Sequence, residues 1–310
     1  MNAINEKRKP VRMQPKTLFS DRVLNTVVLI IEFALLFITA YPLYFVIIAS
    51  VSSTAEVIMG RVFFWPRGFH IDGYKYVLEY KAIWNGYMNT IIYTVSHTVI
   101  ATFITLLTGF ALSRRTLPGR RGIMLFMGFT MYFSGGMIPT YLVYKSYGFS
   151  GNPFLYVLIG ALSVYNVIIT RTFMESNVPE ALWEAASIDG SSFTHFFFRI
   201  ALPLSPAITA ILILFYAVGQ WNSWFNAMLY LKEQQRPLQN VLRTVMSSTN
   251  LAGQTDLSAM QGDSNINETM LMLQCVKYCI IIVATLPIMC LYPFVQKYFL
   301  KGIMVGAIKG

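Results

Sequence analysis

Six stretches of this sequence contain no Asp, Glu, Lys or Arg, and each is 19 residues or longer. They cover residues 33–55, 82–113, 122–144, 146–170, 200–231 and 278–296. About 20 apolar residues in a helix cross the hydrocarbon core of a bilayer. Charged residues make up only 12% of the chain, whereas soluble domains carry roughly 25%. The sequence therefore predicts an all-α polytopic membrane protein with six transmembrane helices.

Two of the expected spans contain residues that interrupt helices. We expect the spans at about 23–50, 87–112, 123–144, 154–171, 204–229 and 278–296. The third is interrupted by Ser134-Gly135-Gly136 and Pro139, and the sixth contains Pro287 and Pro293. Membrane helices keep such residues where neighbouring helices or a water-filled cavity satisfy the freed backbone. They indicate helices that line a path, although Pro and Gly are also commoner in membrane helices generally.

Basic residues predict the orientation, because Lys and Arg favour cytoplasmic loops. If the N-terminal segment 1–22 is cytoplasmic, the inner segments hold 15 of the 24 Lys and Arg residues and the longer outer segments hold nine. Both termini of the transmembrane domain, residues 23–310, are therefore predicted to lie in the cytoplasm. Because the net charge of +10 is explained by orientation, we expect no nucleic-acid partner.

Two predicted outer segments are long, and neither carries catalytic chemistry. Residues 51–86 include an amphipathic stretch from Tyr74 to Trp84, and residues 230–277 are expected to form a polar loop, either folded against a partner or solvated. No G-x-x-x-x-G-K-[ST] phosphate-binding loop is present, so the chain is not expected to bind ATP by that route. The three cysteines and three histidines lack metal-ligand spacing, so we expect no metal, cofactor or catalytic residue on this chain.

A polar segment, residues 179–200, separates the fourth and fifth spans and predicts a helix–turn–helix elbow. Pro179 suits a first helical turn, and Glu180 and Glu184 favour the positive end of a helix dipole. Gly190 ends the helix because glycine readily adopts the left-handed conformation. Ala181, Ala185 and Ile188 would form one smooth face, Ser191 or Ser192 would cap the next helix, and Phe193, Phe196, Phe197 and Ile200 would form an apolar stripe.

These residues resemble a known motif. The run Glu184-Ala185-Ala186-x-x-Asp189-Gly190, followed by Phe197 and Leu202-Pro203, is similar to the EAA loop of binding-protein-dependent ABC import permeases, with Ser191 in place of the usual Ala. The segments 130–141 and 169–173, together with Trp221-Asn222, resemble the carbohydrate-importing subgroup, and within it the branch that takes complex oligosaccharides in Gram-positive bacteria. Residues 302–310 resemble the end of maltose-type permeases, so the resemblance covers nearly the whole chain.

The resemblance implies a type I importer permease in a bacterial cytoplasmic membrane that works by alternating access. Its expected partners are a second, different permease, two ATP-binding subunits that hold ATP and Mg²⁺, an extracytoplasmic solute-binding protein and an oligosaccharide. The first elbow helix would dock on an ATP-binding subunit and act as a lever. The coupling residues carried over are Glu180, Glu184, Ala185, Ala186, Asp189 and Gly190.

Uncharged polar and aromatic residues in the spans are candidates for a sugar path, because polar side chains inside a bilayer usually face the bundle interior or a cavity. The main group is Tyr216, Gln220, Trp221, Asn222, Trp224 and Asn226, and weaker candidates are Asn166, Tyr165, Asn89 and Tyr93. The alternative is that these side chains hold helices together or lie in interface belts.

Two other function classes stay open. A permease of the same superfamily for peptides or amino acids shares the elbow, so only the sugar-branch segments disfavour it. A membrane-embedded transferase would need clustered acidic or His residues at the membrane edge, and none are apparent among the 14 acidic residues. The sequence does not name the sugar or its length.

Overall fold

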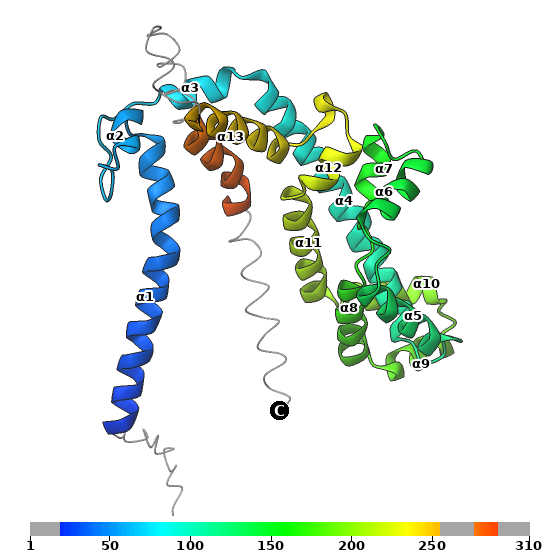
Figure 1. Cartoon of the computed structure of the whole chain (residues 1–310). Helices are drawn as coiled ribbons and strands as arrows, with labels where there is room; N and C mark the ends of the chain where they lie inside the picture. The colour runs from blue at the N-terminus through cyan, green and yellow to red at the C-terminus, as the bar shows by residue number, and fades with distance from the viewer. Residues whose placement is uncertain (1–18, 255–275, 291–310) are drawn as a thin grey trace, which may run out of the picture.

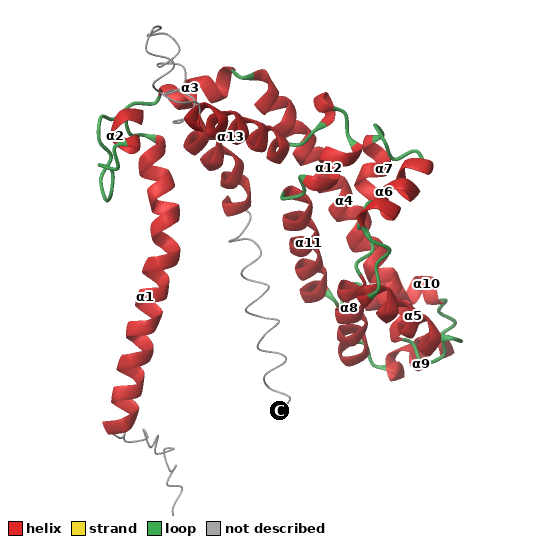
Figure 2. Cartoon of the chain, in the orientation of Figure 1, coloured by secondary structure: helices red, strands yellow, loops and turns green. Residues whose placement is uncertain are grey.

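The structure, a computed structural model of the 310-residue chain, describes residues 19–254 and 276–290. This described part contains helices and no strand, as Figure 2 shows, so the all-α prediction is confirmed for it. In chain order the elements are α1 (Phe19–Ser50), α2 (Thr54–Ile58), α3 (Asp72–Glu79), α4 (Lys81–Ser113), α5 (Arg120–Tyr132), α6 (Met137–Ser146), α7 (Pro153–Leu158), α8 (Val164–Asn177), α9 (Glu180–Ile188), α10 (Phe193–Phe196), the π-helix η1 (Phe197–Ala201), α11 (Pro206–Trp221), α12 (Phe225–Tyr230), the 3₁₀-helix η2 (Glu233–Gln235), α13 (Leu238–Gln254) and a last helix, Val276–Cys290.

Helix α4 is the element around which the chain is built (Figure 1). It packs most extensively against α8 and α11 and also contacts α13. A Cβ atom added at Gly109 would lie 2.5 Å from Thr170 Cγ2 and 3.2 Å from the Arg171 backbone nitrogen. Small residues commonly let membrane helices approach this closely. Gly109 therefore fixes the spacing between α4 and α8.

The two ends of α4 carry separate buried cores. Near its C-terminal end, Phe110 packs with Met174 of α8, Phe196 of α10 and Leu212 of α11. Near its N-terminal end, the core joins α3, α13 and the last helix through Val77, Ile83, Leu238 and Ile280. The first core lies where the elbow meets the helices, so it positions the candidate site.

Two described helices are long and apolar enough to cross a membrane, Val23–Ser50 and Lys81–Ser113. Two bent helix pairs pass the same test: α5 with α6, bent by 117°, and Phe193–Ala201 with α11, bent by 89°. The first two spans lie where the sequence predicts them. The described residues thus supply two spans, or up to four if each bent pair is one span, and the count of six stays a prediction.

Several predicted boundaries are wrong. The span 154–171 is broken, because α7 ends at Leu158 and α8 begins only after Ser163, whose hydroxyl accepts from the Asn166 backbone N–H. The span 204–229 ends early, because α11 stops at Trp221 before the separate helix α12. The predicted interruption of the third span is present at Gly136, where the chain reverses rather than continuing.

The predicted polar loop 230–277 is also partly wrong, because α13 occupies Leu238–Gln254 and packs against α4. Its apolar positions Leu238, Leu242 and Val245 recur at helical spacing and belong to the second core. Residues 1–18, 255–275 and 291–310 lie outside the described part, and with them the predictions for most of the segment 1–22, Cys275, Pro293, the end of the sixth span and the C-terminal segment 302–310.

Helix α1 stands apart from the other described helices along most of its length (Figure 1). None of its most apolar 18-residue window is buried in the chain. Contacts gather at its C-terminal end, where Ser50 Oγ lies 2.8 Å from Tyr74 Oη and the Phe45 ring contacts Tyr278 edge-on. Because its exposed side chains are apolar on all sides, as at Phe33 and Ile38, α1 is suited to lipid or another membrane subunit.

Candidate functional site

The predicted elbow is present with the geometry that its sequence indicates. Helix α9 runs from Glu180 to Ile188, and Gly190 follows it with φ of 76°. The Ser192 hydroxyl accepts a hydrogen bond from the His195 backbone N–H at 3.2 Å and so caps α10. The second limb continues through η1 and turns by 89° into α11. The π-helix was not predicted.

One side of the elbow is fixed to the chain's own body. The Trp183 ring stacks on Phe193 with centroids 3.9 Å apart and meets Phe196 edge-on. Phe196 and Phe197 are fully buried, and Ala186 is buried in the same core. Aromatic packing of this kind joins the two limbs into one unit, which rests on α4 and α8.

Arg114, at the end of α4, ties this unit to the helix bundle. Its side chain is 4% exposed, and its Nη2 donates to the Val178 carbonyl at 2.9 Å while Nε donates to Ser113 Oγ at 3.1 Å. Its Nη1 lies 3.6 Å from the Glu180 carboxylate, and its guanidinium faces the Phe110 ring. Burial lowers the pKa of the Arg114 guanidinium from its usual value, while Glu180 opposes that shift.

The opposite side of α9 is exposed. Ala181, Ala185 and Ile188 share one helical face, and the Ile188 side chain is 87% exposed. Glu184 and Asp189 flank this face and are also exposed. Five of the six predicted coupling residues therefore separate into two groups, and the sixth, Gly190, forms the turn after α9. Glu180 and Ala186 belong to the inner side of the elbow, whereas Glu184, Ala185 and Asp189 are available to a partner.

Glu175 of α8 links α5 to this region. Its Oε1 pairs with Arg171 Nη2 at 3.0 Å and also with Arg120 at the start of α5. Together with Arg114 and Glu180, these residues line a pocket of about 440 Å³ beside the elbow. Sequence reasoning treated these arginines only as orientation signals, because nothing in the sequence shows which carboxylate each one meets.

Much of the predicted sugar-path cluster holds the fold together. Tyr216 is buried, and its hydroxyl lies 2.7 Å from Thr105 Oγ1 of α4. Trp221 is also buried, and its Nε1 donates to the Ala284 carbonyl at 3.2 Å. Gln220 is half-buried on the same helix. Tyr216 and Trp221 thus join helices, which is the alternative that the sequence left open.

The weaker candidates are divided in the same way. Asn89 Nδ2 donates to the Gln234 carbonyl at 3.2 Å, and the Tyr93 hydroxyl donates to the Gln235 carbonyl at 3.0 Å. Both side chains of α4 therefore hold the turn containing η2. Asn166 is buried in α8, whereas Tyr165 beside it is 55% exposed.

Asn222 and Trp224 instead open onto a pocket of about 390 Å³ between α11, α13 and the last helix. Gln239, Arg243 and Thr285 also line it. The Arg243 guanidinium lies 3.8 Å from the Trp224 ring centroid, as in a cation–π contact. Aromatic, amide and guanidinium groups here suit a sugar carrying a carboxylate. Arg243 and Gln239 were missed, because residues 230–277 were predicted to form a loop; the helical spacing of α13 was the signal that could have found them.

No group of three or more His, Cys, Asp or Glu residues within the described ranges is arranged to hold a metal ion. Two features of the described residues are candidates for function: the exposed face of α9 and the polar pocket beside α13. In Figure 1, α9 and α13 lie at opposite ends of α4.

Comparison with known proteins identifies related chains. No family model matches the sequence. The chain is 39% identical over 286 residues to the "Polygalacturonan/rhamnogalacturonan transport system permease protein YtcP" of Bacillus subtilis, covering 91% of this chain and 97% of that one. It is 40% identical over 274 residues to "Protein LplC" of the same species, covering 88% and 90%. A third relative, the "Melibiose/raffinose/stachyose import permease protein MelC" of Bacillus subtilis, is 25% identical over 273 residues, covering 87% of this chain and 91% of that one.

A solved structure is also similar. It belongs to a bacterial ABC transporter involved in the import of the acidic polysaccharide alginate, and the two chains superpose with a TM-score of 0.81 at 32% sequence identity. The match covers 92% of this chain and 100% of the other.

Proposed function

The chain belongs to the family of carbohydrate ABC importer permeases, and from that membership we propose how its parts serve import. Such a chain is a membrane-embedded transport subunit for oligosaccharides and not an enzyme. We propose six spans with both termini in the cytoplasm, which places α9 at the cytoplasmic face and α13 at the outer face. The prediction from the distribution of Lys and Arg supports this orientation.

In this proposal α9 is the coupling helix, and the two-sidedness of α9 is the observation that carries it. Its inner side is held by aromatic packing and by Arg114, while Glu184, Ala185 and Ile188 are exposed. Because α9 is packed against the elbow on one side, movement of a partner bound to its exposed side would move the whole elbow. An ATP-binding subunit would dock on the free side, and closure of the two ATP-binding subunits would move the elbow together with α4 and α8.

A second permease is the natural neighbour of α1. The apolar window of α1 is not buried by its own chain, so its packing surface is available to another membrane subunit. An extracytoplasmic solute-binding protein would deliver the sugar at the outer end. Gly190 provides the turn between the limbs of the elbow rather than a contact.

We further propose an acidic oligosaccharide as the substrate. One relative is named for polygalacturonan and rhamnogalacturonan transport, and the similar structure is of an alginate importer. The Arg243–Trp224 pair supports this choice, because an arginine beside an aromatic face can bind a carboxylate while the ring stacks on the sugar. Neutral oligosaccharides, for which MelC is named, are the alternative.

Reconstituting the importer with its partner subunits in liposomes tests this function. Galacturonate oligomers, presented with the binding protein, should stimulate ATP hydrolysis and enter the liposomes, whereas raffinose should do neither. Glu184→Lys should abolish stimulation and weaken capture of the ATP-binding subunit. Glu79→Lys, at an exposed carboxylate of α3 beyond the other end of α4, is the matched control for capture and should bind the ATP-binding subunit as the wild type does. Normal coupling in Glu184→Lys would contradict the proposed docking, and stimulation by raffinose alone would contradict the acidic substrate.

A further inference from the structure

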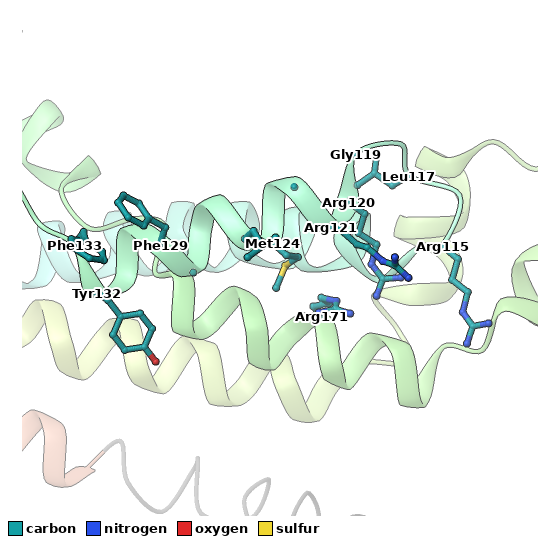
Figure 3. A pocket seen from close by; sticks show the side chains of 13 residues that line it. Arg115, Leu117, Gly119, Arg120, Arg121, Met124, Phe129, Tyr132, Phe133 and Arg171 are labelled. Carbon is teal, nitrogen blue, oxygen red and sulfur yellow. The ribbon is translucent and has the colours of Figure 1, made fainter.

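A groove along α5 combines basic residues at one end with apolar residues along its length. Its volume is about 1330 Å³. Figure 3 shows the arginine side chains gathered near the start of α5 and the aromatic side chains toward its end. We call this the α5 groove; its basic end is formed by Arg115, Arg120, Arg121 and Arg171, and its apolar shaft includes Met124, Phe129 and Tyr132.

The basic end carries more positive charge than the chain neutralises. Glu175 is shared by Arg120 and Arg171. Arg115 and Arg121 are exposed and have no ion-pair partner among the residues that the structure describes. The first turn of α5 contains no acidic residue, so the positive end of its dipole adds to the same field. This end of the groove therefore favours an anion.

The apolar shaft has the length of one membrane leaflet. The part of α5 from Met124 to Tyr132 has nine residues, which is roughly 13 Å at 1.5 Å per residue. Half of a bilayer's hydrocarbon core is roughly 15 Å thick. Phe129 is 56% exposed and Tyr132 is 84% exposed, so their rings are uncovered along this length. A ligand with a charged head and long apolar chains matches both parts at once.

We propose that the α5 groove is a binding site for an anionic phospholipid of the inner leaflet, such as phosphatidylglycerol. The phosphate would lie among Arg115, Arg120 and Arg121, and an acyl chain would lie against Met124 and Phe129. Basic pockets beside membrane helices on the cytoplasmic side bind such headgroups. The choice of leaflet rests on the orientation proposed above. Because Glu175 joins Arg120 and Arg171, a bound lipid would also steady the contact between α5 and α8 near the elbow.

Native mass spectrometry of the assembled importer tests the site without depending on transport. The purified complex is titrated with phosphatidylglycerol and, separately, with phosphatidylcholine. The wild type should bind phosphatidylglycerol more tightly than phosphatidylcholine. The double variant Arg115→Gln/Arg121→Gln should bind it about 30-fold more weakly, given about 1 kcal/mol for each basic residue near an anionic lipid. Arg67→Gln, at an exposed arginine of the opposite end, should leave the affinity unchanged.

Two further measurements identify the occupant. A photoreactive residue in place of Leu125, which is 75% exposed, should form an adduct with lipid; an adduct with a protein subunit would overturn the proposal. Inorganic phosphate should not displace the lipid. Full displacement by phosphate would show that the groove binds an anion and not a lipid, which would overturn the proposal.

Equal affinity of the double variant and the wild type for phosphatidylglycerol would also overturn the proposal. Loss of coupled transport with intact lipid binding would instead contradict the proposed function alone.

Discussion

Replacing Arg114 with Met should disconnect the elbow from α4. The change removes hydrogen bonds to the Val178 carbonyl and to Ser113 and leaves the Glu180 carboxylate unpaired. Removing one partner of a buried ion pair costs about 3–5 kcal/mol. The Glu180 side chain is 30% exposed, so water replaces part of the lost interaction. We therefore expect the lower limit, about 3 kcal/mol, which is roughly a hundredfold in the equilibrium between a docked and an undocked elbow.

Hydrogen exchange of the assembled importer measures this equilibrium directly. Backbone amides of Glu180–Ile188 that are protected in the wild type should exchange roughly a hundredfold faster in Arg114→Met, because local opening exposes them. Uptake of sugar per ATP hydrolysed should fall, because the ATP-binding subunits would move the elbow without moving α4 and α8. Arg114→Lys should lie between the two, because it keeps the charge and loses the forked geometry of the guanidinium.

Arg199→Met is the matched control, because Arg199 is an exposed arginine of the same elbow with no ion pair in the described part of the chain. Its exchange rates over Glu180–Ile188 should equal those of the wild type. Unchanged exchange in Arg114→Met, with the complex intact, would refute the reasoning. Aromatic packing around Trp183 would then be sufficient to hold the elbow.

Three other changes test separate parts of the structure. Gly109→Val should lower stability by about 1–3 kcal/mol, because its Cβ would lie 2.5 Å from Thr170 Cγ2, and the melting temperature should fall accordingly. Gly219→Val is the control and should have a much smaller effect, because no atom lies within 4 Å of a Cβ added there. Gly190→Val should cost about 2 kcal/mol and uncouple ATP hydrolysis from uptake, because φ of 76° disfavours a β-branched residue; coupling equal to that of Gly219→Val would contradict this. Trp224→Ala should raise the KM for galacturonate oligomers several-fold by removing a stacking surface and the partner of Arg243, and an unchanged KM would remove the pocket from the sugar path.

The sequence predicts the parts of this fold that depend on local chemistry. The first two spans follow from their long apolar runs, the end of α9 follows from Gly190, and the start of α10 follows from Ser192. Each of these features needs only the residues on either side of it. The exposure of Ile188 could also be anticipated, because its face lies opposite Ala186 and Trp183 on the helix.

The break between α7 and α8 also had local signals in the sequence, but the long uncharged run led to the prediction of one continuous span. Gly160 adopts φ of 74°, and Ser163 has the residue type of a helix cap immediately before Val164. A long uncharged run indicates that a segment can lie in a membrane, and it does not show that the segment forms one continuous helix. The same reasoning applies at Asn222, where α11 ends within a run that carries no charge.

Contacts distant in sequence could not be predicted. Arg114 and the Val178 carbonyl are 64 residues apart, and Tyr216 and Thr105 are 111 residues apart. A polar residue in a span has the same appearance in the sequence whether it meets sugar or a neighbouring helix. Packing decides between these roles, and it assigns Tyr216 to the contact between α4 and α11 while leaving Trp224 at a pocket.

The isolation of α1 has a mechanical consequence. Its span of 28 residues is roughly 42 Å long at 1.5 Å per residue, and its contacts with the described part of the chain gather at one end, near Ser50. A rod anchored in this way amplifies rotation: a change of about 10° at the anchor displaces the free end by about 7 Å over that length. The tilt of α1 is therefore set by the lipid or subunit that surrounds it. If that neighbour does not fit α1, the largest displacement occurs at the end of α1 farthest from Ser50.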